Sequence, residues 1–233
     1  AEPRMLIDKI SYANSLKDVN PLEKFILSVG VLVFLLMTKE KTVFIMNFVI
    51  FNFIILFIMK VSAGKLLKLY SIPAVFILTT LIPMFLIKGD ITMLLLRAFA
   101  SLSAAYFLVC STPAADLDYI FEKLRFPKIF REMFLLIYRY IFVLFDIKDQ
   151  IITAQKSRSG YVNYRTSKRS FGILLISILR KTYYYSRNSV KAVEARLGNE
   201  FIFYQRRYNK PGKEVVFIIT ILLINLFLVV WYA

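Results

Sequence analysis

Long apolar runs separated by short polar turns fill the first half of the chain, and one further run lies at its end. The runs are 22–38, 42–59, 70–87, 91–110 and 215–232. About 20 mainly apolar residues are needed to cross a bilayer, so each run predicts a membrane-spanning helix. The pattern therefore predicts an all-α integral membrane protein with about five transmembrane helices.

Two features within these runs affect the expected packing. Asn47 and Asn52 are the polar interruptions of the second run, and we expect them to hydrogen-bond to neighbouring helices. Pro73 and Pro83 lie in the third run, where they are expected to kink or end the helix.

The segment 111–213 has another pattern, in which apolar residues recur every three or four positions. A first helix is expected to begin at Ser111-Thr112-Pro113, with Thr112 as its N-cap and Pro113 at its first position, and to end near Pro127. A second helix of roughly 30 residues is expected from Pro127. A third is expected from near Ser170, and its apolar stretch is too short to span a bilayer. We expect it to lie along the membrane surface or to pack on the second helix, which gives a domain of three amphipathic helices.

Charged residues assign these segments to the two sides of the membrane. The segment 111–213 has 20 Lys and Arg against 8 Asp and Glu, which accounts for +12 of the net charge of +16. Cytoplasmic loops carry an excess of Lys and Arg, so this segment and the N-terminus are expected in the cytoplasm and the C-terminus outside. The expected organisation is a cytoplasmic segment 1–21, four spans in 22–110, the cytoplasmic domain 111–213 and a last span in 214–233.

Composition narrows the chemistry that the chain itself can perform. With 58% hydrophobic residues it is expected in a membrane, and its net charge reflects topology rather than nucleic-acid binding. The sequence has no His and one Cys, so no metal site is expected within the chain. It also lacks a phosphate-binding loop G-x-x-x-x-G-K-[ST], and without His it has no Ser/His/Asp set. No catalytic residues and no cofactor are expected, and the first 21 residues lack the apolar core of a signal peptide.

Two copies of one short pattern, A-x-x-[Ser/Ala]-Arg-x-Gly, occupy 154–160 and 192–198. One interpretation is structural, because a cation in the last turn of a helix interacts favourably with the macrodipole and Gly is a common helix stop. The functional interpretation, which the duplication favours, is that each guanidinium makes a bidentate bond to a carboxylate in a groove of a partner. The candidate residues are Ser157, Arg158, Ser159, Ala195, Arg196 and Leu197.

Four features in a fixed order carry a resemblance to a known family. They are Ile7-Asp8 with Asn14, Leu16 and Pro21, then Ser111-Thr112-Pro113, then Leu136-Ile137-Tyr138-Arg139-Tyr140-Ile141, and finally the two Arg motifs. Over nearly its whole length the chain resembles the transmembrane T component of energy-coupling factor (ECF) transporters, in particular the CbiQ-type subunit of cobalt uptake systems.

The resemblance implies a function and a set of partners. In that family, two Ala-Arg-Gly motifs on a cytoplasmic coupling domain dock onto two ATP-binding-cassette (ABC) ATPase subunits, and the T component also holds a substrate-binding membrane subunit. ATP is then bound by the partners, and the expected location is the plasma membrane of a prokaryote. Carried over, 157–159 and 195–197 occupy the coupling positions. Here Gly follows each Arg one position later, at Gly160 and Gly198, which leaves the cap geometry and the role of Leu197 open.

The fourth run contains a second candidate site. Arg97 lies inside this run, where an ionisable residue is costly and suggests function, although it could also extend to the outer end of the span. Ala100 and Ala104 belong to a set of small residues that lets another helix approach closely. These three residues are candidates for contact with the substrate-binding subunit, and packing within the chain is the alternative.

Other functions stay open. A T component of a vitamin transporter is the main alternative, and the residues Ile7-Asp8 and Tyr138-Arg139-Tyr140 argue against it. A membrane-integral enzyme acting on anionic lipids, or a tether that binds phosphates through the basic domain, is less favoured. The sequence does not distinguish cobalt from nickel, because it holds no metal ligands of its own.

Overall fold

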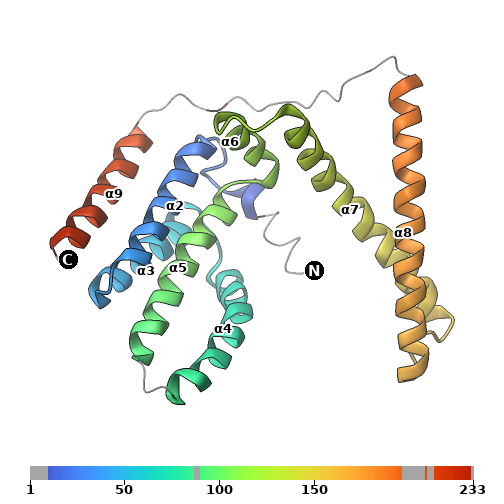
Figure 1. Cartoon of the computed structure of the whole chain (residues 1–233), viewed down its shortest axis with the longest axis horizontal. Helices are drawn as coiled ribbons and strands as arrows, with labels where there is room; N and C mark the ends of the chain where they lie inside the picture. Colours follow the sequence, from blue (N-terminus) through green and yellow to red (C-terminus); the bar gives the residue numbers. More distant parts are fainter. Residues whose placement is uncertain (1–9, 87–89, 196–207, 209–212, 232–233) are drawn as a thin grey trace. The chain divides into compact units, whose positions relative to one another are not determined.

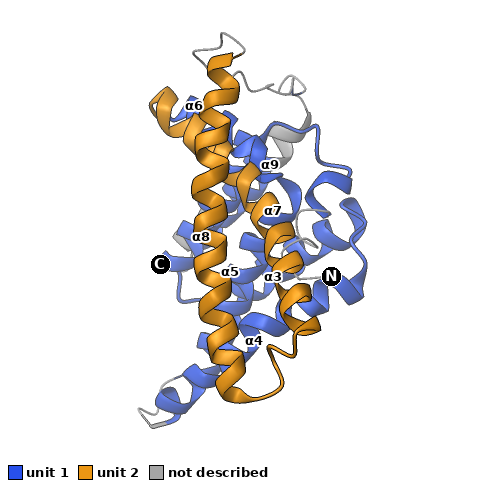
Figure 2. Ribbon diagram, turned by 90° about the vertical axis from the view of Figure 1, so that its right-hand side faces the viewer, with its two compact units in different colours: residues 1–124, 205–233 blue, residues 125–204 orange. Residues whose placement is uncertain are grey.

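The computed structural model describes residues 10–86, 90–195, 208 and 213–231, and the chain divides into two compact units (Figure 2). The membrane unit comprises residues 1–124 and 205–233, and the hairpin unit comprises residues 125–204. The described residues form helices and turns without a β-strand. The predicted all-α architecture is therefore confirmed.

Three described helical segments of the membrane unit are long and apolar enough to cross a bilayer. They are α3 (Lys41–Phe53) with the π-helical turn η1 (Ile54–Ile58), α4 (Ala63–Leu86) and α5 (Ile91–Ser111). The first and last apolar runs also form helices, α2 (Pro21–Met37) and α9 (Lys213–Trp231), and these two pack side by side (Figure 1). The protein is thus an all-α integral membrane protein, and membrane crossing by α2 and α9 stays a prediction.

The core of the membrane unit forms where α2, α3 and α5 pack together. Leu27, Val31 and Leu35 recur at four-residue spacing on α2, so they form one buried stripe. The facing side of α5 has small residues, and the Ser28 hydroxyl donates to the carbonyl oxygen of Ala104 at 2.8 Å. Small side chains therefore allow α2 and α5 to approach closely.

Buried amides connect helices that are far apart in the sequence. Asn47 on α3 donates through Nδ2 to Oδ1 of Asn225 on α9 at 2.7 Å, and both side chains are fully buried. The Tyr70 hydroxyl on α4 donates to Oδ1 of Asn52 at 3.3 Å. The predicted role of Asn47 and Asn52 in bonding to neighbouring helices is confirmed.

The third span differs from the prediction, because α4 begins at Ala63 and continues through both prolines. Pro73 has no N–H group for the carbonyl of Leu69, four residues earlier. The Tyr106 hydroxyl on α5 donates to this Leu69 carbonyl at 2.8 Å. A neighbouring helix therefore supplies the hydrogen bond that proline removes, and α4 is not ended at Pro73.

The helix start predicted at Ser111-Thr112-Pro113 is wrong in its details. The helix α5 extends to Ser111, and Thr112 is its C-cap in an extended conformation. Pro113 precedes a short 3₁₀ turn, η2 (Ala114–Asp116), which leads into α6 (Leu117–Lys123). The reason is steric, because the ring of a proline moves the preceding residue out of the helical region. As predicted, α6 ends before Pro127.

The hairpin unit consists of two long helices, α7 (Lys128–Ser157) and α8 (Tyr164–Ala195). The 30 residues of α7 confirm the long helix predicted after Pro127. The next helix starts six residues earlier than the predicted Ser170, because Thr166 caps it. The Thr166 hydroxyl accepts from the N–H of Asn163 at 3.0 Å and donates to its carbonyl at 2.8 Å, in the manner of a capping box.

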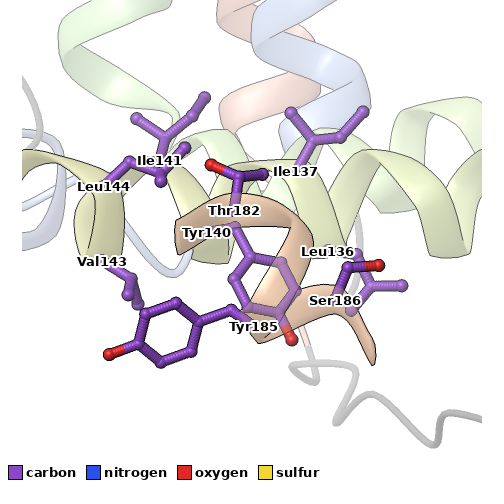
Figure 3. A pocket seen from close by; sticks show the side chains of 9 residues that line it. All are labelled: Leu136, Ile137, Tyr140, Ile141, Val143, Leu144, Thr182, Tyr185 and Ser186. Atoms are coloured by element: carbon purple, nitrogen blue, oxygen red, sulfur yellow. The ribbon is translucent and has the colours of Figure 1, made fainter. Parts of the chain in front are cut away.

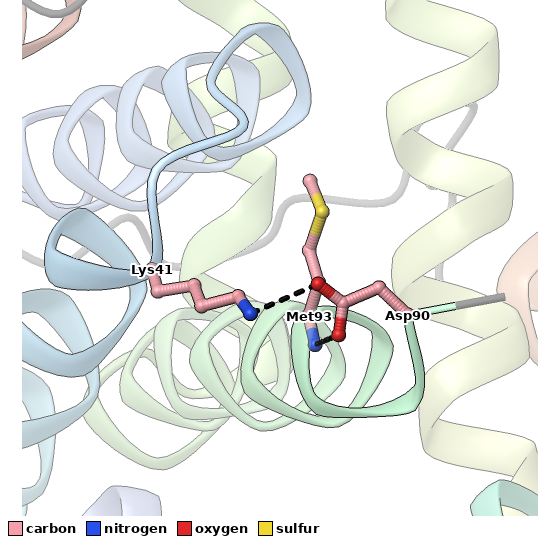
Figure 4. A network of polar contacts seen from close by, with 3 residues as sticks. All are labelled: Lys41, Asp90 and Met93. Atoms are coloured by element: carbon pink, nitrogen blue, oxygen red, sulfur yellow. Dashed lines mark hydrogen bonds and ion pairs between the residues drawn. The ribbon is translucent and has the colours of Figure 1, made fainter.

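An exposed ion pair connects the beginnings of α3 and α5 (Figure 4). Lys41 Nζ lies 2.9 Å from Asp90 Oδ2, and Asp90, the N-cap of α5, accepts from the N–H of Met93. The hydrogen bond from Lys41, together with that from Met93, holds the pKa of the Asp90 carboxyl below its ordinary value.

The lowered pKa of Asp90 predicts a pH-dependent stability. A group with a depressed folded-state pKa stabilises the fold above its unfolded pKa, and this contribution is lost as the pH falls through the folded value. We expect wild type to melt slightly above Asp90→Asn at neutral pH, because Asn retains the cap but not the charge. The difference should shrink below pH 3.8, the ordinary pKa of the carboxyl, in thermal unfolding of the purified protein. A difference that stays constant in strong acid would contradict the ion pair.

The Asn47–Asn225 bond predicts a coupling between α3 and α9. Leucine at either position leaves the partner amide buried without this bond, whereas leucine at both positions removes the two polar groups together. We expect the double-mutant cycle of Asn47→Leu and Asn225→Leu to give a coupling of about 0.6–1.7 kcal/mol, the range for hydrogen bonds between membrane helices. The measurement is the unfolding free energy in mixed micelles. Additive effects would exclude the bond.

Candidate functional site

The first Arg motif forms the C-terminal cap of α7. Ser157 is the last helical residue and Arg158 is the C-cap. The N–H of Ser159 donates to the carbonyl of Lys156 at 3.0 Å, and the N–H of Gly160 donates to that of Gln155 at 2.8 Å. This pair of hydrogen bonds defines a Schellman motif, in which the residue after the C-cap takes the left-handed conformation.

Ser159 is the left-handed residue, with φ of 56°. In the Ala-Arg-Gly pattern that the sequence analysis used for its resemblance, the position directly after Arg belongs to Gly, which takes positive φ without steric cost. Gly160 therefore does not end α7 by adopting a positive φ, because no described glycine has a positive φ. A Cβ on Gly160 would lie 2.6 Å from Ser170 Oγ and 2.8 Å from the Gln155 carbonyl oxygen. The displaced glycine is thus required for close contact with α8.

The side chains of Ser157, Arg158 and Ser159 are exposed, although their backbone is well bonded. The Arg158 guanidinium makes no hydrogen bond or ion pair with any other residue that the structure describes. Its position at the end of α7 is compatible with the macrodipole interpretation. It also leaves all five N–H donors of the guanidinium available to a carboxylate.

The described part of the second motif, residues 192–195, lies at the other end of the hairpin unit. Gln155 on α7 contacts Ser170 on α8, and Tyr140 contacts Ser189, so the two helices are antiparallel. The 32 residues of α8 extend over about 48 Å at 1.5 Å per residue. Ala195 is the last described residue of α8 and is exposed. Arg196, Leu197 and Gly198 lie outside the described residues.

Arg97 caps the C-terminus of α2. Its Nε donates to the carbonyl of Leu35 at 3.2 Å, and one terminal nitrogen donates to those of Leu36 and Thr38 at 2.7 and 3.1 Å. Arg97 also lies over the ring of Phe44, 5.7 Å from its centroid. These contacts give the arginine a structural role inside the membrane unit.

Ala100 and Ala104 are both fully buried within the membrane unit. The structure thus places them in the packing of this chain's own helices, which was the alternative interpretation. Contact of Arg97 with a second subunit stays a prediction.

Two residues to which the sequence analysis assigned no capping role cap α5 in a similar way. Lys24 on α2 is buried, and its Nζ donates to the carbonyl of Ser111 at 3.0 Å. Asn14 donates to the carbonyl of Cys110 at 2.9 Å. The sequence did contain a signal for Lys24, because a lysine at the start of an apolar run is unusual. The negative end of a helix dipole attracts such a cation, and the C-terminus of α5 does so here.

The hairpin unit also contains an apolar cavity of about 310 Å³ between α7 and α8 (Figure 3). Nine residues line it: Leu136, Ile137, Tyr140, Ile141, Val143, Leu144, Thr182, Tyr185 and Ser186. Its walls offer hydroxyl groups but no carboxylate, imidazole or thiol. Within the described part of the chain, no three His, Cys, Asp or Glu side chains gather into a metal site.

The fold and these sites define the class of an all-α membrane protein with an exposed, basic helical hairpin. A family model described as CbiQ, cobalt transport protein, matches residues 91–209, which include α5 to α8 and both Arg motifs. The chain belongs to the CbiQ family of cobalt transport proteins.

Several known proteins are similar to this chain. An uncharacterised protein of Methanocaldococcus jannaschii is 31% identical over 191 residues, covering 72% of this chain and 71% of that protein. A putative fused cobalt transport protein CbiMQ of Methanocorpusculum labreanum is 34% identical over 91 residues, covering 39% and 15%. The cobalt transport protein CbiQ of Rhodobacter capsulatus is 32% identical over 103 residues, covering 44% and 42%. The aligned part of the chain therefore spans less than half of the Methanocorpusculum labreanum and Rhodobacter capsulatus proteins.

The left-handed Ser159 predicts a stabilising substitution. Glycine adopts positive φ freely, so Ser159→Gly should raise the unfolding free energy by roughly 0.5–1 kcal/mol, even though glycine gains entropy in the unfolded chain. The matched control is Ser157→Gly, two residues earlier and helical, which should lower stability. Thermal unfolding of the purified variants measures both. A lower melting temperature for Ser159→Gly would show that this residue is not left-handed.

Proposed function

We propose that the chain is the scaffold and coupling subunit of an ATP-driven uptake transporter of the ECF type for cobalt, with nickel as the alternative ion. In this role two ABC-type ATPases bind ATP, and the chain transmits their movement to a substrate-binding membrane subunit. Family membership supports a transport role. The relatives named for cobalt transport favour a metal ion over a vitamin as cargo.

The observation that carries the proposal is the placement of Arg158 at the end of α7 and of Ala195 at the end of the described part of α8. The antiparallel arrangement of α7 and α8 separates these two helix ends by most of the length of α8, about 40 Å or more. We infer that an arginine next to Ala195 in the sequence would not share one groove with Arg158. The geometry therefore favours two separate acidic grooves, as a pair of ATPase subunits would offer.

The charge of the hairpin unit supports a cytoplasmic location. Residues 150–193 contain nine Lys and Arg and no Asp or Glu. A segment of this composition next to membrane helices is retained on the cytoplasmic side, where ATP is available, and it is attracted to anionic lipids. The fused CbiMQ relative supports a second transport subunit beside this chain.

Charge reversal of both arginines tests the proposal. Arg158→Glu together with Arg196→Glu should abolish cobalt uptake in cells that produce the whole complex, while the chain still inserts into the membrane. Loss of a buried charge pair costs about 2–5 kcal/mol, which weakens docking by about 30-fold or more at each groove.

Arg180→Glu serves as the control, because it makes the same charge change at an exposed position in the middle of α8. This variant should transport like wild type. Wild-type uptake by the double variant would refute coupling through these residues.

A further inference from the structure

A ring of hydrogen bonds surrounds the turn that presents Arg158. Gln155 on α7 donates through Nε2 to the carbonyl of Ser170 on α8 at 2.9 Å. The Ser170 hydroxyl donates to the carbonyl of Gly160 at 2.7 Å. The Gly160 N–H donates back to the carbonyl of Gln155 at 2.8 Å. These three bonds close a ring at the base of the turn, and residues 156–159 are the segment that connects Gln155 to Gly160.

Two further contacts tighten this ring. The Tyr161 hydroxyl donates to Oε1 of Gln155 at 2.7 Å, so both ends of the carboxamide are bonded and its orientation is fixed. The close approach of Gly160 to Ser170 leaves no room for a Cβ. Ser170 is one of the two buried residues of α8, whereas residues 157–159 are exposed.

The result is a turn whose backbone is held by several hydrogen bonds and whose side chains at 157–159 are exposed. A loop that is ordered before it binds loses less conformational entropy when it docks, and its affinity is higher for that reason. A displacement of the Arg158 Cα would also spoil the angular match that a bidentate guanidinium–carboxylate pair requires.

We propose that Gln155, Tyr161 and Ser170 are positioning residues for Arg158, which hold its turn in the conformation that enters the partner's groove. The inference rests on the proposed coupling function and extends it to residues outside the motif. These three residues act through the backbone of the turn and do not themselves contact the partner.

The test measures the dissociation constant between the full chain in nanodiscs and the ATPase subunits that co-purify with it. Gln155→Ala should raise this constant about tenfold, and Tyr161→Phe, which removes one hydroxyl, about threefold. Gln150→Ala is the matched control, because Gln150 is exposed on the same helix, and it should have no effect.

A second measurement separates positioning from general stability. Each variant is combined with Arg158→Ala, and a positioning residue should have no further effect once the arginine is absent. An equal loss with and without Arg158 would overturn the inference, as would unchanged binding for both Gln155→Ala and Tyr161→Phe. If Arg158→Ala itself binds like wild type, the coupling function of this motif fails instead. Should Gln155→Ala fail to fold, Tyr161→Phe carries the same test.

Discussion

The membrane unit depends on one constraint, which is that backbone carbonyl groups at helix ends and at prolines need donors where water is scarce. The helices α2 and α5 meet this need reciprocally. Arg97 on α5 donates to the last carbonyls of α2, and Lys24 on α2 donates to the last carbonyl of α5. Tyr106 does the same for the carbonyl that Pro73 leaves free on α4. Charged and polar side chains within apolar helices thus have a structural cause, and their presence is not by itself a sign of a transport path.

The last carbonyl groups of α7 also need hydrogen-bond donors, but here the donors are not side chains of another helix. There the last carbonyls are satisfied by the backbone of the turn itself, so the Arg158 side chain is not used as a cap donor. Arg97 and Arg158 are both arginines near helix C-termini, and they differ in whether the guanidinium is already bonded. This difference makes Arg158 the better candidate for recognition of a partner.

Much of the candidate site could be predicted from the sequence, and each prediction that was wrong has a physical cause. The two Arg motifs, the long α7 and the amide contacts of Asn47 follow from residue types and spacing. The start of α8 at Tyr164 was missed because a polar segment with many charges looks like a connector until Thr166 is seen to cap it. The interpretation of Gly160 as a helix stop misses its role, because the sequence does not show how close Ser170 lies to it.

The sequence by itself determined the membrane class, the helical architecture, the basic domain and the duplicated motif, because hydrophobic runs, helical periodicity and charge act locally along the chain. Only the tertiary structure decided which side chains are already bonded and which are free to bind. It assigned Ala104 to packing within this chain and left Arg158 exposed on a fixed turn. The physical reason is that a hydrogen bond depends on distance and direction between groups far apart in sequence, and no pattern of residue types contains that geometry.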